Sequence, residues 1–173
     1  MESNNFLSRI ILIFVITAFI FIEGCSYSFT GASVPPYLKT IAIPNFSDRS
    51  GSGEFNLGEN LTNSLIQKFV DDNTLLVTDK LNSDSILEGT IVSLTDAPVV
   101  VSGGENISSR RLTITVKATY KDLVKHQTVF EKNFSNYGDY PTDGDLVTAR
   151  QGAIESAIDK ITEDILLGVV SNW

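Results

Sequence analysis

The sequence predicts an α+β domain in which two amphipathic helices pack on one face of a mixed, largely antiparallel sheet of four or more strands. Apolar residues recur with the helical period in two segments, 57–70 and 153–169. The segment Arg110–Lys121 alternates strictly between apolar and polar residues, which is typical of an antiparallel strand buried on one side only. Two such helices and a half-buried sheet cover their apolar surfaces most simply as a two-layer sandwich.

The N-terminal segment is typical of an export signal. Arg9 precedes the apolar run Ile10–Ile22, which is shorter than the roughly 20 residues that a membrane span needs. The run leads to Cys25, the only cysteine, and Ile22-Glu23-Gly24-Cys25 resembles a bacterial lipobox. In such signals the thiol receives fatty acids such as palmitate, and cleavage makes the cysteine the first residue. We therefore predict a lipoprotein signal peptide at residues 1–24 and lipidation of Cys25. The alternatives are an ordinary signal peptide or a membrane anchor with an incidental cysteine.

Residues 25–37 contain Pro35 and Pro36 and are expected to form an extended tether, followed by a single domain at residues 38–173. The nearly continuous apolar run Leu38–Phe46 predicts a buried strand. Asn56, with Glu59 three positions later, predicts a capping box at the start of the first helix. The expected apolar stripe of that helix consists of Leu57, Leu61, Leu65 and Phe69.

The second half of the domain predicts two hairpins and a terminal helix. Residues 74–78 and 86–95 are expected as strands, the second with a bulge at Gly89, and residues 96–105 as a long hairpin loop. Residues 128–135 are the expected partner of Arg110–Lys121, and residues 137–144 an irregular connection. Asp145 is the expected N-cap of the last helix.

The charge distribution argues against a nucleic-acid-binding role. The chain has a formal net charge of -8, and an acidic protein attracts nucleic acid poorly. The segment from Arg110 to Lys132 is an exception, because it holds six basic residues and only two acidic ones, Asp122 and Glu131. These six are Arg110, Arg111, Lys117, Lys121, Lys125 and Lys132.

Few residues suggest catalysis or metal binding. The single histidine, His126, falls in an expected turn without a cysteine or histidine neighbour. Asp139, Asp143 and Asp145 lack the twelve-residue spacing and the final glutamate of a calcium loop. We therefore expect no enzyme activity, no cofactor and no metal.

Several segments together resemble the LPS-assembly lipoprotein (LptE) family. They are the lipobox with Tyr27–Gly31 after it, the strand Lys39–Phe46, the helix Asn56–Phe69, the strand Asp84–Ile91 and the terminal amphipathic helix. The resemblance implies two helices on a sheet of about four or more strands. It also implies a non-enzymatic protein that sits in the lumen of a large outer-membrane β-barrel, as its plug and chaperone, and contacts lipopolysaccharide. The implied location is the outer membrane, with a lipid anchor, facing the periplasm or the barrel lumen.

Two groups of residues are candidate contacts, neither taken over from the family. Arg110, Arg111, Lys117 and Lys121 are candidates for the anionic head group of lipopolysaccharide or an acidic barrel wall, because arginine and lysine bind phosphate well. Val99, Val100 and Val101 are candidates for an apolar loop tip that docks on the barrel. The basic residues are alternatively a solvated strand face. The whole chain is alternatively a lipoprotein of another envelope assembly (a secretion pore or a cell-wall synthase activator) or a structural lipoprotein.

Overall fold

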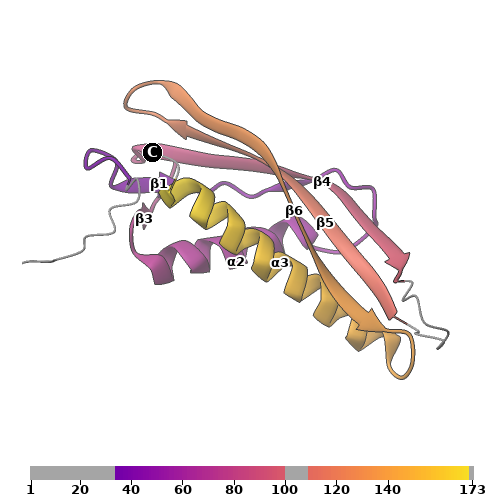
Figure 1. Ribbon diagram of the computed structural model, residues 1–173. Helices are drawn as coiled ribbons and strands as arrows, with labels where there is room; N and C mark the ends of the chain where they lie inside the picture. The colour runs from indigo at the N-terminus through magenta and orange to yellow at the C-terminus, as the bar shows by residue number, and fades with distance from the viewer. Residues whose placement is uncertain (1–33, 100–108, 172–173) are drawn as a thin grey trace, which may run out of the picture. The chain divides into compact units, whose positions relative to one another are not determined.

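The strands and helices form two layers, with the helices against one face of a single sheet (Figure 1). The computed structural model describes residues 34–99 and 109–171. The expected signal peptide, Cys25 and most of the expected tether lie outside these residues. Within the described ranges, no helix combines the length and hydropathy that a membrane span requires.

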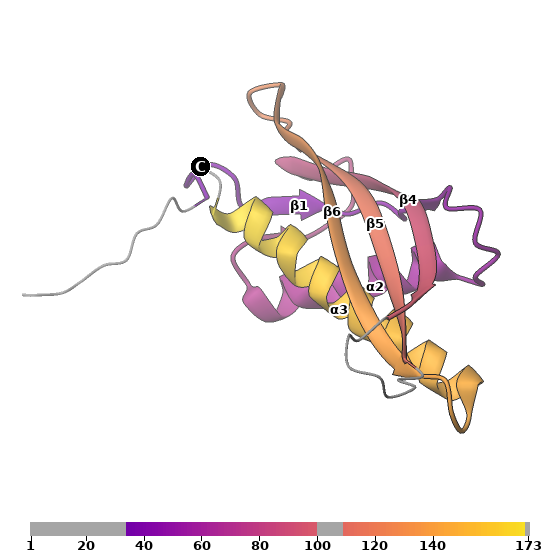
Figure 2. The same ribbon diagram turned by 45° about the vertical axis from the view of Figure 1, so that its right-hand side comes forward.

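Within the described residues the sheet has six strands, in the order β3-β1-β4-β5-β6, and β2 pairs with β4. The bounds are β1 Thr40–Ala42, β2 Ser47–Asp48, β3 Leu76–Val77, β4 Ser85–Pro98, β5 Ser109–Asp122 and β6 Gln127–Pro141. The three short strands pair in parallel, whereas β4, β5 and β6 form an antiparallel meander. This arrangement confirms the mixed, largely antiparallel sheet. Figure 2 shows the meander as three strands side by side, with helix α3 across them.

Strand β5 has the two faces that its alternation predicts. Its apolar residues, Leu112, Ile114, Val116, Ala118 and Tyr120, are fully buried. The intervening residues lie on the face away from the helices, which we call the open face. Burial raises the pKa of the Tyr120 hydroxyl to about 12, so this side chain is neutral at physiological pH.

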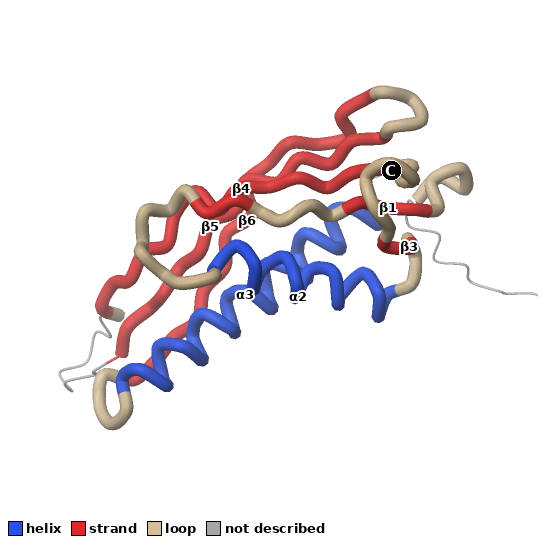
Figure 3. Tube along the Cα trace, turned by 180° about the vertical axis from the view of Figure 1, so that it is seen from behind, coloured by secondary structure: helices blue, strands red, loops and turns tan. Residues whose placement is uncertain are grey.

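Both helices bury the predicted stripes. Helix α2, Leu57–Asp72, buries Leu57, Leu61, Leu65 and Phe69. Helix α3, Leu146–Ser171, buries Ala153, Ile154, Ala157, Ile158, Ile161, Ile165, Leu166 and Val169. The view from behind shows both helices on the same side of the strands (Figure 3). Asp145 caps α3 as expected, because its Oδ1 accepts hydrogen bonds from the amides of Val147 at 3.1 Å and Thr148 at 3.2 Å.

The expected capping box of α2 is wrong. Helix α2 does begin after Asn56, but Asn56 has a φ of 55° and its side chain makes no capping hydrogen bond. A capping side chain requires an extended backbone at this position, whereas the backbone of Asn56 is left-handed.

The expected strand Leu38–Phe46 is only partly a strand. Strand β1 ends at Ala42, and the chain then leaves the ladder before the two-residue β2. The amide of Phe46 donates to Oγ1 of Thr62 at 2.9 Å, so a side chain of α2 replaces a ladder partner. The apolar residues Ile43 and Phe46 are nevertheless buried, as their pattern predicts.

The bulge in β4 lies between Ile91 and Ser93, not at Gly89. Gly89 serves close packing instead, because a Cβ at this position would lie 2.1 Å from the ring of Phe46. The first residues of two expected loops are also strand: residues 96–98 of the loop 96–105 and residues 137–141 of the connection 137–144. Strand β4 continues through Pro98, and β6 continues through Pro141, each paired with β5 along its length.

Candidate functional site

The open face carries three of the predicted basic residues. Arg111, Lys117 and Lys121 alternate along β5 with the buried apolar residues, and we call these three the basic row. Their side chains are 40–49% exposed. The sequence-predicted row therefore lies on the face opposite the helices.

Arg111 forms a two-pronged ion pair with the neighbouring strand. Its Nε donates to Oδ1 of Asp139 at 2.7 Å, and its Nη2 donates to Oδ2 at 2.8 Å. The guanidinium carbon also lies 3.6 Å from the ring centre of Tyr137, within cation–π distance. The hydrogen bond from Arg111 lowers the pKa of the Asp139 carboxyl below its ordinary value.

The two lysines of the basic row are paired as well. Nζ of Lys117 lies 2.5 Å from Oε1 of Glu131 on β6, and Nζ of Lys121 lies 2.7 Å from Oε2 of Glu88 on β4. These lysine hydrogen bonds lower the pKa of Glu131 and of Glu88. The basic row is therefore balanced by carboxylates from the two adjacent strands, which the sequence segment alone does not include.

A depression of about 390 Å³ lies in the middle of the open face. Its charged lining consists of Arg49, Lys117, Glu88 and Glu131. It offers cations, carboxylates and threonine hydroxyls to a polar ligand. Among residues 34–99 and 109–171, no three His, Cys, Asp or Glu side chains are grouped to hold a metal ion.

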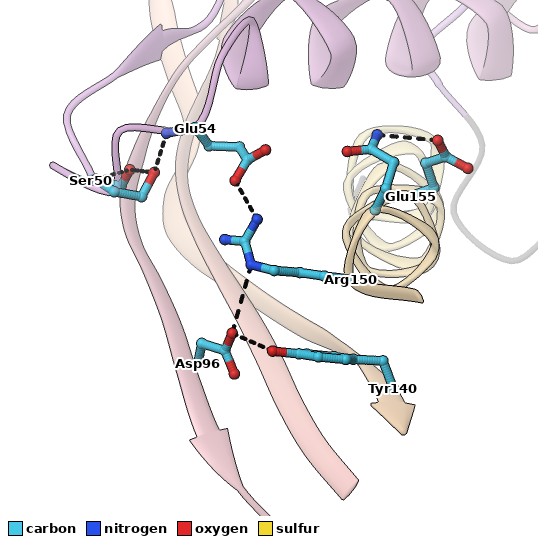
Figure 4. A network of polar contacts seen from close by, with 8 residues as sticks. Ser50, Glu54, Asp96, Tyr140, Arg150 and Glu155 are labelled. Atoms are coloured by element: carbon cyan, nitrogen blue, oxygen red, sulfur yellow. Dashed lines mark hydrogen bonds and ion pairs between the residues drawn. The ribbon is translucent and has the colours of Figure 1, made fainter. Parts of the chain in front are cut away.

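Arg110 lies on the opposite face of β5 from the basic row and belongs to a polar cluster around Asp96. Figure 4 shows Asp96, Tyr140, Arg150 and Glu54 of this cluster. Nε of Arg110 donates to Oδ1 of Asp96 at 2.9 Å, and the hydroxyl of Tyr140 donates to Oδ2 at 2.6 Å. Arg150 of α3 lies 3.6 Å from Asp96 and 2.6 Å from Oε2 of Glu54. The cluster thus joins β4, β5, β6, α3 and the loop before α2.

The pKa of Asp96 reflects two opposing effects. Desolvation by itself would raise this pKa, but hydrogen bonds from Tyr140 and Arg110 and the charges of Arg110 and Arg150 outweigh it. The pKa of the carboxyl therefore lies below its ordinary value. Asp96 is a carboxylate at neutral pH and holds two cations in place.

This cluster was not predicted from the sequence. Asp96 falls in the segment expected to be a hairpin loop, and Glu54 in the turn-rich stretch before the first helix. After the bulge, Leu94, Asp96 and Pro98 share one face of β4. Because the middle one of the three is charged, the apolar spacing gives no signal for that face.

Of the three candidate valines, only Val99 is among the described residues, directly after β4. The amide of Val99 donates to the carbonyl of Ser109 at 2.9 Å, which closes the described part of the hairpin. Val100 and Val101 lie outside the described residues, so the apolar loop tip stays a prediction.

The outer face of the helix layer is acidic. Its exposed carboxylates are Glu59, Asp71, Asp72, Glu155, Asp159, Glu163 and Asp164. Among its lysines, Lys68 bridges Asp159 at 2.9 Å and Glu163 at 3.1 Å. The basic row is paired with carboxylates, whereas the helix layer has a clear excess of exposed carboxylates over lysines.

The fold defines the class of protein: an α+β domain with two helices on one face of a mixed sheet. The model of the LptE lipopolysaccharide-assembly family matches residues 38–167, and the chain belongs to this family. The family consists of non-enzymatic accessory lipoproteins. None of the curated protein sequences compared with the chain matches it.

Several solved structures share this fold. A hypothetical protein from Chlamydia trachomatis has a TM-score of 0.58 and 9% identity, covering 76% of this chain and 95% of its own. A Xanthomonas campestris protein has a TM-score of 0.58 and 16% identity, and the match covers 81% of this chain and 90% of that protein. The rare lipoprotein B from Shewanella oneidensis has a TM-score of 0.50 and 14% identity, covering 75% and 92%. At these identities the likeness concerns the fold alone.

Proposed function

We propose that this chain is an outer-membrane lipoprotein that plugs and supports a large β-barrel translocon and assists lipopolysaccharide assembly. The observation that carries the proposal is the family match over residues 38–167. The lipobox-like Ile22-Glu23-Gly24-Cys25 supports a lipid anchor on Cys25. Acyl chains at this position would hold the domain stably on a bilayer, because two or more chains anchor far better than one.

The distribution of charge favours the open face as the contact for anionic groups. Lipopolysaccharide carries phosphates and carboxylates, and the carboxylates of the helix face would repel them. On the open face, an incoming phosphate can take over the hydrogen bonds that Arg111 and Lys117 give to Asp139 and Glu131. We therefore assign lipopolysaccharide contact to Arg111, Lys117 and Lys121. Arg110 instead helps to hold the sheet against α3, through its ion pair with Asp96.

The first test is a charge reversal on the open face. We expect Arg111→Glu with Lys117→Glu to reduce several-fold the amount of lipopolysaccharide that the purified lipoprotein retains in a pull-down. The matched control is Lys39→Glu with Lys68→Glu, which makes the same change in charge away from the open face and should leave the retained amount unchanged. Equal losses in both variants, or no loss in either, would contradict a contact on the open face.

The second test addresses the barrel partner. If Val99, Val100 and Val101 form an apolar tip that enters the barrel, replacing all three with serine should reduce co-purification of the barrel from solubilised outer membranes. Circular dichroism should stay unchanged, because Val99 lies at the end of the hairpin. Co-purification at the original level would remove the valines from the interface. A ring-shaped oligomer without a barrel, identified by mass, would favour a different envelope assembly.

A further inference from the structure

One end of the sheet is built from four segments that lie far apart in the sequence. The amide of Leu76 on β3 donates to the carbonyl of Lys39 at 2.9 Å, and the amide of Leu123 donates to the carbonyl of Asp84 at 2.9 Å. The hydroxyl of Tyr37 donates to Oδ2 of Asp122 at 2.8 Å. Residues 34–39, β3, the turn at residues 79–84 and the β5–β6 hairpin tip at residues 122–126 are thus joined, and we call them the anchor end.

The anchor end exposes aliphatic side chains from three of its segments. Leu76 is 60% exposed, Leu81 96% and Val124 53%. Beside Leu76 is a concavity of about 490 Å³, lined mainly by Val34, Pro35, Pro36 and Leu38. Exposed aliphatic side chains on segments joined at one end of a domain favour a surface there that contacts a lipid or protein partner.

Two carboxylates of the anchor end, Asp79 and Asp84, accept hydrogen bonds from backbone amides of the same end. Asp79 accepts the amide of Leu81 at 2.9 Å, and Asp84 accepts the amide of Lys39 at 2.9 Å. Lys39, Lys80 and Lys125 are exposed and have stems long enough to carry their ammonium groups back to water. Because Asp71 and Asp72 are also exposed at the end of α2, the attraction to a surface here is apolar rather than electrostatic.

The short stretch of chain between Cys25 and Val34 favours a lipid bilayer as the partner of the anchor end. Val34 is the first described residue and lies nine positions after Cys25, and nine residues reach about 30 Å at most. The 14-residue strand β4 spans about 45 Å, and α3 begins at the opposite end of the sheet from β1 and β3 (Figures 1 and 2). Acyl chains on Cys25 would therefore hold the anchor end close to the bilayer.

We propose that the anchor end lies on the lipid surface that holds the acyl chains, with Leu76, Leu81 and Val124 in the boundary between head groups and acyl chains. The opposite end of the sheet, with Val99 and the start of α3, then lies farther from the acyl chains. This inference rests on the proposed lipidation of Cys25. Docking at two places, the acyl chains and the aliphatic side chains, would give the domain one orientation on the membrane.

The test compares two exposed aliphatic positions at opposite ends of the domain. Leu81 and Val147 are 96% and 81% exposed, so a label at either position leaves the core intact. The acylated full chain with Leu81→Cys or Val147→Cys is labelled with an environment-sensitive fluorophore and reconstituted into phosphatidylcholine–phosphatidylethanolamine vesicles that contain brominated lipids. We expect quenching and a blue shift for the Leu81→Cys label and neither change for the Val147→Cys label.

Mass spectrometry of the same samples distinguishes a failure of the proposed docking from a failure of the proposed lipidation. An acylated Cys25 with an unquenched Leu81→Cys label, or with equal quenching at both positions, overturns the docking and leaves the proposed function standing. A mature chain without fatty acid on Cys25 overturns the proposed lipoprotein function and the docking together.

Discussion

Gly138 allows the closest approach between the sheet and α3. A Cβ at this position would lie 2.1 Å from the carbonyl oxygen of Ala153, a backbone atom in the first half of the helix. No rotamer change can relieve such a contact, so the helix would have to move away from β6. The glycine is thus required by packing rather than by a turn.

We expect Gly138→Ala to lower the free energy of unfolding by about 1–3 kcal/mol, the usual cost of overpacking a core. Urea unfolding of the purified chain measures this. The control is Gly152→Ala in helix α3, where an added Cβ would have no atom within 4 Å. That variant should be unchanged or more stable by up to about 1 kcal/mol, because alanine favours helix over glycine. Equal stability of the two variants would refute the close approach.

Among the elements, α2 is bounded at both ends by asparagines in the left-handed conformation. Asn56 has a φ of 55° and Asn73 a φ of 56°, and the amide of Asn73 donates to the carbonyl of Phe69 at 3.0 Å. Asparagine tolerates this backbone better than other residues that carry a Cβ. The end of the helix is therefore determined by a single residue and its backbone conformation.

Two substitutions of asparagine by alanine in α2 should have opposite effects. Asn73→Ala should cost about 1 kcal/mol, because alanine pays the steric penalty of a left-handed backbone. Asn63→Ala, at an exposed position inside the helix, should raise stability by a few tenths of a kcal/mol through helix propensity. Asn73→Gly should be at least as stable as the original chain. Denaturant midpoints at constant slope measure all three, and a stabilising Asn73→Ala would contradict the assigned conformation.

At the scale of the whole molecule, the two layers are joined by their apolar faces and by the polar cluster around Asp96. The apolar contact is the larger contribution, since both helix stripes and the inner face of β5 are buried. The polar cluster adds direction, because Arg110 and Arg150 approach Asp96 from β5 and from α3. It also positions the loop before α2 through Glu54.

We expect Asp96→Asn to lower the free energy of unfolding at pH 7 by about 1–3 kcal/mol, because two arginines lose their charged partner. The folded-state pKa of Asp96 is depressed, so its contribution is complete above the unfolded-state pKa of about 4 and is lost as the pH falls through the folded-state value. The difference between the original chain and the variant should thus shrink below about pH 4. Thermal unfolding across pH 2–7 measures it (about the range in which carboxyl groups titrate).

The control for this prediction is Asp143→Asn, at an exposed position in the turn before α3. It removes the same charge and should leave stability nearly unchanged. A constant difference between Asp96→Asn and the original chain down to the lowest pH would contradict the ion-pair role of Asp96.

The sequence by itself determined the features that depend on local periodicity. The stripes of α2 and α3, the two faces of β5, the N-cap at Asp145 and the two-layer fold all follow from the spacing of apolar residues and one capping side chain. These features can be predicted from the sequence because each depends on residues within a single helix or strand. The resemblance to the LptE family, carried by such segments, was confirmed by the family match.

Only the tertiary structure decided how the charges are paired and where the strands end. Glu88, Glu131 and Asp139 neutralise the basic row from neighbouring strands, and Asp96 gathers two arginines from different layers. Strands β4 and β6 run past the turn-forming residues near their ends because β5 supplies hydrogen-bond partners along their length. Such contacts join residues many positions apart, and their energies depend on distances that a linear pattern does not contain.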